Sequence, residues 1–175
     1  MNVKFLNPFV DAAYEVLCSE TGQDVKRGDL RLETSVYVTD DLTVIISLVG
    51  AVEGTVFYSM SEGTAIRLAS QMLGEPIDQL NYLAQSGIAE IGNVITGRAS
   101  MKLASAGFES TISTPSLVLG QGASISTLDY PRLVVPLVTH VGEILIHLAL
   151  RQGNGRGLKT PQLSIPKAFE VPIEA

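Results

Sequence analysis

One stretch of the sequence, SGIAEIGNVITG at residues 86–97, brings together side chains that can do chemistry. Its polar members Ser86, Glu90 and Asn93 follow one another at intervals of four and three residues. Asparagine is no base near neutral pH, but its amide can both donate to and accept from a water molecule. Hydrolysis of a reactive acyl phosphate needs a water in line with phosphorus and a metal ion that stabilises charge. A neighbouring glutamate can fix the pose by pairing with a partner lysine.

These residues fall on one side of a predicted helix. Residues 77–106 read as helical, with a start at Asn81 or near Asp78 and a natural stop at Gly107. At about 100° per residue, the core face is formed by apolar residues: Ala84, Ile88, Ile91 and Ile95. A separate face is formed by four polar or small residues, which we call the polar stripe: Ser86, Glu90, Asn93 and Gly97.

The alternative interpretation of this stripe is an ordinary solvated helix face, on which glutamate is common. Two features argue against it. Asparagine prefers caps to helix interiors. Gly92 and Gly97 each cost up to about 1 kcal/mol relative to alanine at such positions. A helix that carries these destabilising residues on one side is shaped for close contact with another molecule.

The other elements are predicted from local patterns. Residues 7–21 form a helix in which Asn7 caps and Pro8 occupies the first turn. Residues 30–37 are strand-like, and a second helix begins near Ser61 and ends at Gly74. Two apolar hairpins are centred on residues 50–53 and on Gly142, and short strands and Gly/Ser loops fill 108–131.

The order helix then hairpin occurs twice, and aligning Gly54 with Gly142 places one apolar hairpin over the other. This repeated pattern predicts an α+β fold of two pseudo-repeated helix–strand halves. We expect the two halves to form one mainly antiparallel sheet covered by helices. We expect one domain at residues 1–150. Residues 151–175, rich in Gly and Pro, are expected to be an extended tail.

Composition limits the classes of function. The chain has 175 residues, 46% of them apolar, and a net charge of −6. The segment after Leu150 carries four basic and two acidic residues, so residues 1–150 carry about −8. Such an acidic domain without a basic stripe predicts no nucleic-acid partner. Without a long apolar run, a signal-peptide layout or a second cysteine beside Cys18, we expect a cytoplasmic protein with no membrane attachment.

The stripe resembles the active-site pattern of the CheC/CheX/FliY family of chemotaxis phosphatases. That pattern is Asp or Ser, three residues, Glu, two residues, Asn, twenty-one residues and Pro. Ser86, Glu90 and Asn93 match it, and Pro115 falls at the family spacing. The resemblance covers about residues 5–150, and the single intact motif is most similar to CheX-type members.

The resemblance implies a phosphatase that acts on a phosphorylated CheY-type response regulator, and it implies a homodimer. Glu90 would pair with a lysine of the regulator, and Asn93 would orient the attacking water. Ser86, Gly97 and Pro115 would shape the binding surface. The chain itself would bind no cofactor, because the Mg²⁺ would belong to the regulator. The sequence leaves open which response regulator is the substrate, because the phosphorylated Asp site is common to all of them.

A second copy of the pattern lies in the first helix, as Asp11, Glu15 and Cys18. A thiol cannot replace an amide in holding a water, and Asp40 stands where the proline belongs. We therefore expect this copy to be degenerate or coincidental.

Other candidates are weaker. His140 and His147 lack nearby metal-ligand companions, Cys18 has no evident histidine partner, and Gly120–Gly122 is too short for a phosphate loop. The main rival function is a non-catalytic adaptor of the flagellar-switch type, in which the same stripe only binds a regulator.

Overall fold

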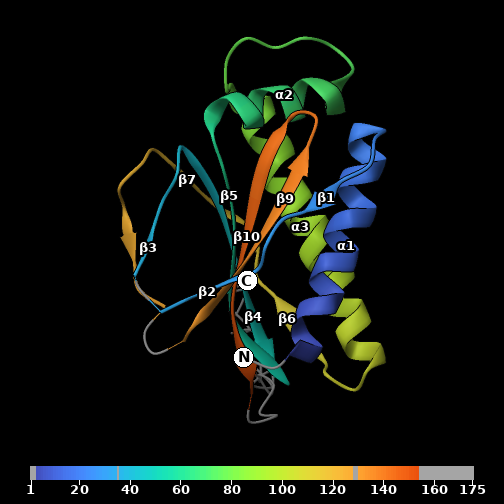
Figure 1. Ribbon diagram of the computed structural model, residues 1–175, viewed down its shortest axis with the longest axis vertical. Coiled ribbons are helices and arrows are strands. Elements are labelled where there is room, and N and C mark those ends of the chain that lie inside the picture. Colours follow the sequence, from blue (N-terminus) through green and yellow to red (C-terminus); the bar gives the residue numbers. More distant parts are fainter. Residues whose placement is uncertain (1–2, 35, 128–129, 154–175) are drawn as a thin grey trace, which may run out of the picture.

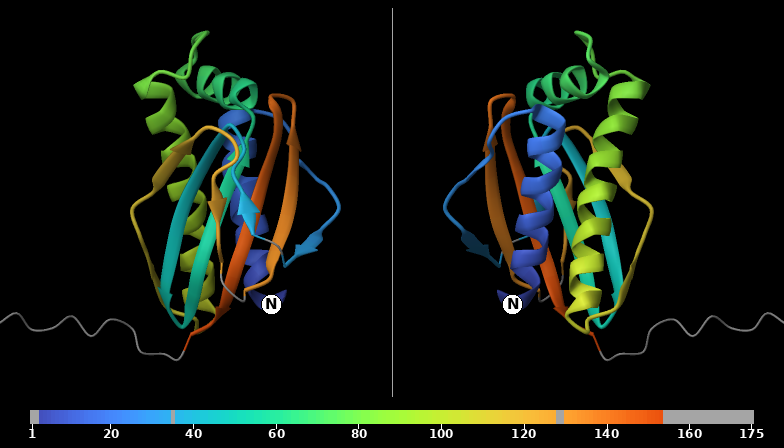
Figure 2. Two further views of the ribbon diagram at one scale, coloured as in Figure 1. Left: turned by 90° about the vertical axis from the view of Figure 1, so that its left-hand side faces the viewer. Right: turned by 90° about the vertical axis from the view of Figure 1, so that its right-hand side faces the viewer.

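The computed structural model describes residues 3–34, 36–127 and 130–153. One sheet carries two long helices, α1 and α3, side by side on one face, and a shorter helix, α2, across one end (Figures 1 and 2). The elements follow in the order α1 (Val3–Thr21), β1 (Lys26–Arg27), β2 (Arg31–Glu33), β3 (Tyr37–Val38), β4 (Leu42–Gly50), β5 (Val52–Met60), α2 (Glu62–Leu73), α3 (Tyr82–Ser105), β6 (Ser110–Ile112), β7 (Ser116–Leu119), β8 (Ser124–Ile125), β9 (Arg132–Thr139) and β10 (Gly142–Gln152).

The sheet has the internal symmetry that the repeated pattern predicted. Its main strand order is β1-β9-β10-β5-β4-β6, and every pairing along it is antiparallel. The long central strands β10 and β5 pair with each other. The hairpin partner β9 lies on the outer side of β10, and the hairpin partner β4 lies on the outer side of β5. The strand after each long helix pairs with the hairpin of the other half. β1, which follows α1, pairs with β9, and β6, which follows α3, pairs with β4. The two predicted halves are therefore confirmed as interlocked repeats of one α+β fold.

The caps of α2 are those that the sequence predicted, and α3 begins at Asn81, one of the two starts that the sequence left open. The side chain of Ser61 accepts a hydrogen bond from the Thr64 amide at the start of α2, and Gly74 ends this helix in a left-handed conformation with φ of 70°. The side chain of Asn81 accepts from the Ala84 amide and so begins α3. Local capping chemistry thus fixes where the helix that carries the polar stripe begins.

The predicted start of α1 is wrong by about one turn. The helix begins at Val3 and includes Pro8, instead of placing Pro8 in its first turn. The lost backbone donor is compensated by packing, because Phe5 and Leu6 are buried in the core. The ring of Phe5 lies edge-on to Phe108 at a centroid distance of 5.3 Å. The start of α1 therefore packs beside the segment that follows α3, so the two helices run antiparallel.

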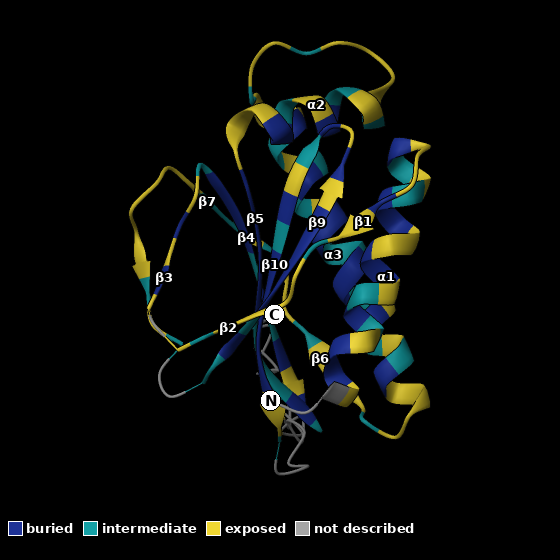
Figure 3. Cartoon of the chain, in the orientation of Figure 1, coloured by how far each residue is buried: buried dark blue, intermediate teal, exposed yellow. Residues whose placement is uncertain are grey.

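The face of the sheet opposite the helices carries a compact polar and aromatic cluster. Tyr37 stacks on Phe57 at a centroid distance of 4.7 Å and meets His147 edge-on at 4.8 Å. Arg132 is only 1% exposed. Its Nη2 atom donates to Glu33 Oε2 at 2.8 Å. These contacts attach the segment through β2 and β3 to the buried strands. Much of this segment is exposed (Figure 3).

Parts of the predicted organisation stay predictions. The strand-like region 30–37 appears as β2 and the start of β3, and β10 continues to Gln152. The expected tail lies mostly outside the described residues. The homodimer that the resemblance implies remains an expectation, and the sheet's outer strands β1 and β6 are short. Among the described residues, no helix is long and apolar enough to cross a membrane.

Candidate functional site on helix α3

Helix α3 presents the polar stripe on the side turned away from the core. Ile88, Ile91 and Ile95 are buried against the rest of the protein. Ser86 and Glu90 are exposed, whereas Asn93 and Gly97 are half-buried. The structure therefore places the four predicted residues on one accessible face, as the helical periodicity required.

The glutamate and the asparagine contact each other directly. The Nδ2 atom of Asn93 donates to Glu90 Oε2 at 3.3 Å. An ionised carboxylate only accepts hydrogen bonds, so the amide nitrogen belongs on the side of Glu90. The carbonyl oxygen Oδ1 is then left to accept from another donor, such as the O–H of a water molecule. The pair holds the amide in the orientation that a water-positioning role requires.

Close packing beneath the stripe fixes the helix on the sheet. A Cβ atom added to Gly92 would lie 3.1 Å from Val44 Cγ1 and 3.2 Å from Tyr58 Cδ2. The hydroxyl groups of Tyr58 and Thr96 lie 2.7 Å apart in a buried hydrogen bond. Burial raises the pKa of the Tyr58 phenol, so it stays neutral. Gly92 is thus explained by close approach to the sheet, and it sits one residue before Asn93.

The other two predicted surface residues lie near the strands that border α3. Pro115 is half-buried between β6 and β7. A Cβ atom on Gly97 would meet only the tip of Ile112, at 3.9 Å. The Ser100 hydroxyl donates to the Ser110 carbonyl at 2.9 Å and joins α3 to β6. The β6–β7 segment that carries Pro115 therefore lies beside the helix that carries the stripe.

The first-helix copy of the pattern has a different environment. Glu15 accepts a hydrogen bond from Lys102 Nζ at 2.8 Å, and Arg98 lies 3.7 Å from its other oxygen. The hydrogen bond to Lys102 is the main reason why the pKa of Glu15 is lowered. Among the described residues, no cation forms an ion pair with Glu90. Glu15 is engaged within the protein, and Glu90 is available to a cation from outside.

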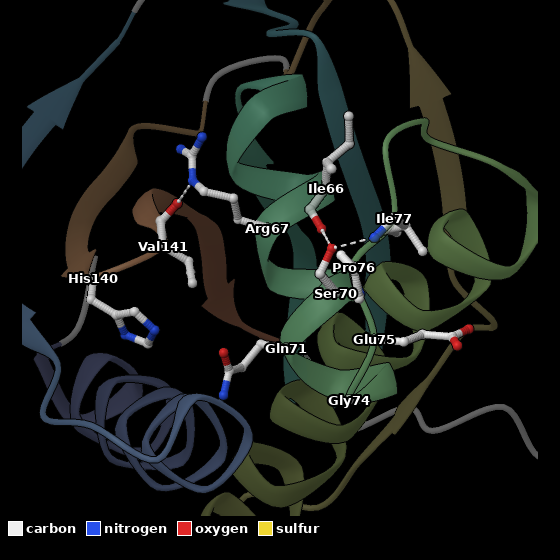
Figure 4. A pocket seen from close by; sticks show the side chains of 10 residues that line it. All are labelled: Ile66, Arg67, Ser70, Gln71, Gly74, Glu75, Pro76, Ile77, His140 and Val141. Carbon is white, nitrogen blue, oxygen red and sulfur yellow. Dashed lines mark hydrogen bonds between the residues drawn. The ribbon is translucent and has the colours of Figure 1, made fainter.

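Several hollows of the described surface lie away from the stripe. One of about 530 Å³ lies between α2, the loop that follows it and the β9–β10 turn (Figure 4). Its side chains do not converge: the Nε atom of Arg67 is turned to the Val141 carbonyl at 2.7 Å, and Ser70 bonds to the Ile77 amide at 3.0 Å. The stripe itself lies on a convex helix. A small substrate would find no enclosure there, whereas a protein that brings its own cleft can receive the helix.

The remaining candidate residues lie outside α3. Cys18 is half-buried and packs against the hydrophobic core. His140 is exposed in a turn, while His147 is buried and lies 3.2 Å from the Ser59 hydroxyl. Desolvation, helped by the nearby Arg132, lowers the pKa of His147 to about 4. No three potential ligands of the His, Cys, Asp and Glu types gather within the described part of the chain.

Similarity to known proteins identifies the class to which this fold and site belong. A CheC-like superfamily protein from Shewanella sp. PV-4 superposes with a TM-score of 0.78 at 26% identity, over 86% of this chain and 99% of the other. CheX from Borrelia burgdorferi, solved in complex with CheY, BeF₃ and Mg²⁺, superposes with a TM-score of 0.74 at 27% identity, over 85% and 98%. The fold is that of the CheC-like proteins.

Sequence comparison narrows this class to one family. The family description "Chemotaxis phosphatase CheX" matches residues 42–138, more than half of the chain. The CheY-P phosphatase CheX of Thermotoga maritima is 28% identical over 155 residues, which are 88% of this chain and 100% of that protein. The chain belongs to the chemotaxis phosphatase CheX family, as the motif resemblance predicted.

Sequence reasoning missed one property of this face. Tyr82, Leu83 and Met101 are large apolar side chains with exposed fractions of 83%, 55% and 64%. All three lie on α3, Tyr82 and Leu83 in its first turn and Met101 near its other end. The helical wheel that defined the stripe would have found them, because at about 100° per residue they fall within about 60° of it.

Proposed function

We propose that this protein hydrolyses the aspartyl phosphate of a CheY-type response regulator by inserting Glu90 and Asn93 into the regulator's active site. The observation that carries the proposal is the Glu90–Asn93 hydrogen bond on an exposed, convex helix face. Membership of the CheX family and the CheY-bound state of the Borrelia relative support it.

The proposed chemistry needs few groups from this chain. The Oδ1 atom of Asn93 accepts from a water and holds it in line with phosphorus. The water oxygen bonds to phosphorus as the bond from phosphorus to the aspartyl oxygen breaks. The regulator regains its carboxylate, inorganic phosphate leaves, and the water's proton passes to phosphate or solvent. Positioning of this kind is the main part of catalysis in phosphoryl transfer.

Glu90 has the complementary role of fixing the complex. An unpaired carboxylate on the protruding face suits a lysine at the regulator's phosphorylation site. A carboxylate accepts more than one hydrogen bond, so Glu90 can pair with that lysine and still hold the Asn93 amide. The Mg²⁺ that offsets phosphoryl charge belongs to the regulator in this proposal, because the stripe offers a single carboxylate and a divalent cation needs several oxygen ligands.

The decisive experiment is dephosphorylation of the organism's CheY-type regulators by wild-type protein, Asn93→Ala and Cys18→Ala. Cys18 is the matched control because it has the position of Asn93 in the first-helix copy. We expect Asn93→Ala to lose about a hundredfold or more of the rate enhancement, and Cys18→Ala to keep it. A folded Asn93→Ala variant with full activity would exclude the water-positioning role. If wild-type protein accelerates none of the regulators, the adaptor function is the better description.

The role of Glu90 is tested by Glu90→Ala with Glu15→Ala as its control. Loss of an ion pair made with the partner raises KM for the phosphorylated regulator, by about tenfold. Glu15 pairs only within this chain, so its removal leaves KM unchanged. Steady-state kinetics that show an unchanged KM and kcat in Glu90→Ala would refute the assignment.

A further inference from the structure

The polar stripe is bordered at both ends by large apolar side chains that no described residue covers. Tyr82, at the first residue of α3, is 83% exposed, and its neighbour Leu83 is 55% exposed. Met101, near the other end of the helix, is 64% exposed. Exposed apolar side chains scattered singly are ordinary, but a set aligned with a proposed active face is a candidate interface.

The spacing of these side chains is regular. Tyr82 precedes Glu90 by eight residues, and Met101 follows Asn93 by eight. At about 1.5 Å per residue, each apolar end lies about 12 Å along the axis from the polar centre, and the whole face is about 29 Å long. This length is close to the diameter of a small domain, so one receiver domain seated on the stripe reaches both ends.

The chemistry of the two parts is also complementary. The centre offers one carboxylate and one amide, which provide orientation but little apolar burial. Tyrosine and methionine are enriched among side chains that anchor protein interfaces. A partner that docks on Glu90 and Asn93 therefore has its apolar contact area at Tyr82, Leu83 and Met101.

Self-association through this face is disfavoured by charge. A two-fold axis through the middle of the stripe would bring Glu90 close to Glu90 of a second copy. No described cation of the chain pairs with this residue, so both carboxylates would lose water without compensation. A partner that supplies a cation at the centre avoids this cost.

We propose that Tyr82, Leu83 and Met101 are the docking anchors for the receiver domain of the phosphorylated regulator. This inference rests on the proposed function and separates its two tasks: the anchors supply substrate affinity, and Asn93 supplies turnover. The anchors touch the regulator's surface around its phosphorylation site and take no part in the reaction.

The test uses the CheY-type regulator that wild-type protein dephosphorylates, and the variants Tyr82→Ala, Met101→Ala and Leu32→Ala. Leu32 is the matched control because it is 63% exposed and lies on β2, a strand remote from α3. KM and kcat are measured with phosphorylated regulator, and Kd with regulator activated by beryllofluoride and Mg²⁺. Truncating an anchor is expected to raise KM and Kd about tenfold with kcat within about twofold, and Leu32→Ala to change neither.

The outcomes separate this inference from the proposed function. If Asn93→Ala abolishes turnover while Tyr82→Ala and Met101→Ala leave KM and Kd unchanged, the anchors are refuted and the catalytic role stands. If Tyr82→Ala instead lowers the mass measured by light scattering, the face is an interface between copies of this chain. If Asn93→Ala keeps full turnover, the proposed function itself fails. Circular dichroism of each variant confirms that the fold is intact.

Discussion

The two long helices carry the same pattern of residues in different surroundings. Glu15 of α1 and Glu90 of α3 occupy equivalent places in two interlocked halves. Each helix also has a threonine that bonds back one turn, Thr21 to the Leu17 carbonyl and Thr96 to the Gly92 carbonyl. The helices therefore share a local design, and their differences identify what the proposed site requires.

The first difference is length. Helix α3 continues to Ser105, so its last turns bring Arg98 and Lys102 alongside Glu15. Helix α1 ends at Thr21, and the positions that would correspond to those two cations lie beyond its end. Because the repeat is asymmetric, Glu15 pairs at the surface with two cations of this chain, whereas Glu90 has no such partner among the described residues.

The second difference is depth of packing. At the position before the key residue, α1 has Leu17, which is fully buried, whereas α3 has Gly92 pressed against Val44 and Tyr58. The side chain of a leucine separates helix and sheet, and a glycine lets them approach. Gly92 therefore lets α3 lie close against the sheet at the point from which Asn93 projects.

The largest effect is expected when this difference is removed by Gly92→Leu. The added Cβ would start 3.1–3.2 Å from Val44 and Tyr58, and further carbons have no space in the core. We expect a loss of about 1–3 kcal/mol in unfolding free energy from overpacking, and a loss of turnover because Asn93 shifts outward. Urea unfolding and regulator dephosphorylation measure the two quantities.

Gly97→Ala is the control for this variant, since its Cβ would meet Ile112 only at 3.9 Å. It should keep the fold, with stability raised by up to about 1 kcal/mol from helix propensity. If Gly92→Leu is as stable and active as wild type, close packing at this point has no role in the site.

A somewhat smaller effect is expected on the face of the sheet opposite the helices. When Gly54 is aligned with Gly142, Ser59 of β5 and His147 of β10 occupy equivalent positions, and the two halves differ there. The folded pKa of His147 is about 4, below the value of about 6.5 for an unfolded chain. Between these values the unfolded state binds more protons, so stability falls as the pH falls through this window. We expect wild-type protein to lose about 2 kcal/mol between pH 7 and pH 5, measured by urea unfolding.

Two variants isolate this effect. In His147→Leu the difference between pH 7 and pH 5 should largely disappear, because the titrating group is gone. In His140→Gln it should persist, because His140 lies exposed in the β9–β10 turn. An unchanged pH dependence in His147→Leu would assign the loss of stability to other groups.

The features of the fold and the site that can be predicted from the sequence are those that depend on residues close together in the chain. Periodicity predicts both hairpins and the stripe. Ser61 is a candidate cap for α2, and Asn81 is one for α3 with Asp78 as the alternative, because capping is decided within a few residues. The start of α1 was missed because burial of Phe5 outweighs the preference of Pro8 for a first turn. The pairing of Glu15 with Lys102 was beyond reach, since it joins residues 87 positions apart through the fold.

The smallest effect is expected from rebuilding the pattern in α1 by Cys18→Asn. This single change gives α1 the three helical residues of the pattern, Asp11, Glu15 and Asn, while Asp40 still stands where the proline belongs. We expect no second active site, because Glu15 remains bound to Lys102 and Arg98 and cannot receive a cation from a regulator.

Activity should be measured in the Asn93→Ala background, where any turnover must come from α1. Adding Lys102→Ala and Arg98→Ala to Cys18→Asn frees Glu15 and provides the sharper comparison. If Cys18→Asn alone restores dephosphorylation, the ion pairs of Glu15 do not decide which helix works. If only the combined variant gains activity, they do. If neither gains any, the ion pairs of Glu15 do not decide which helix works, and the differences that remain are Leu17, the shorter α1 and Asp40 at the proline position.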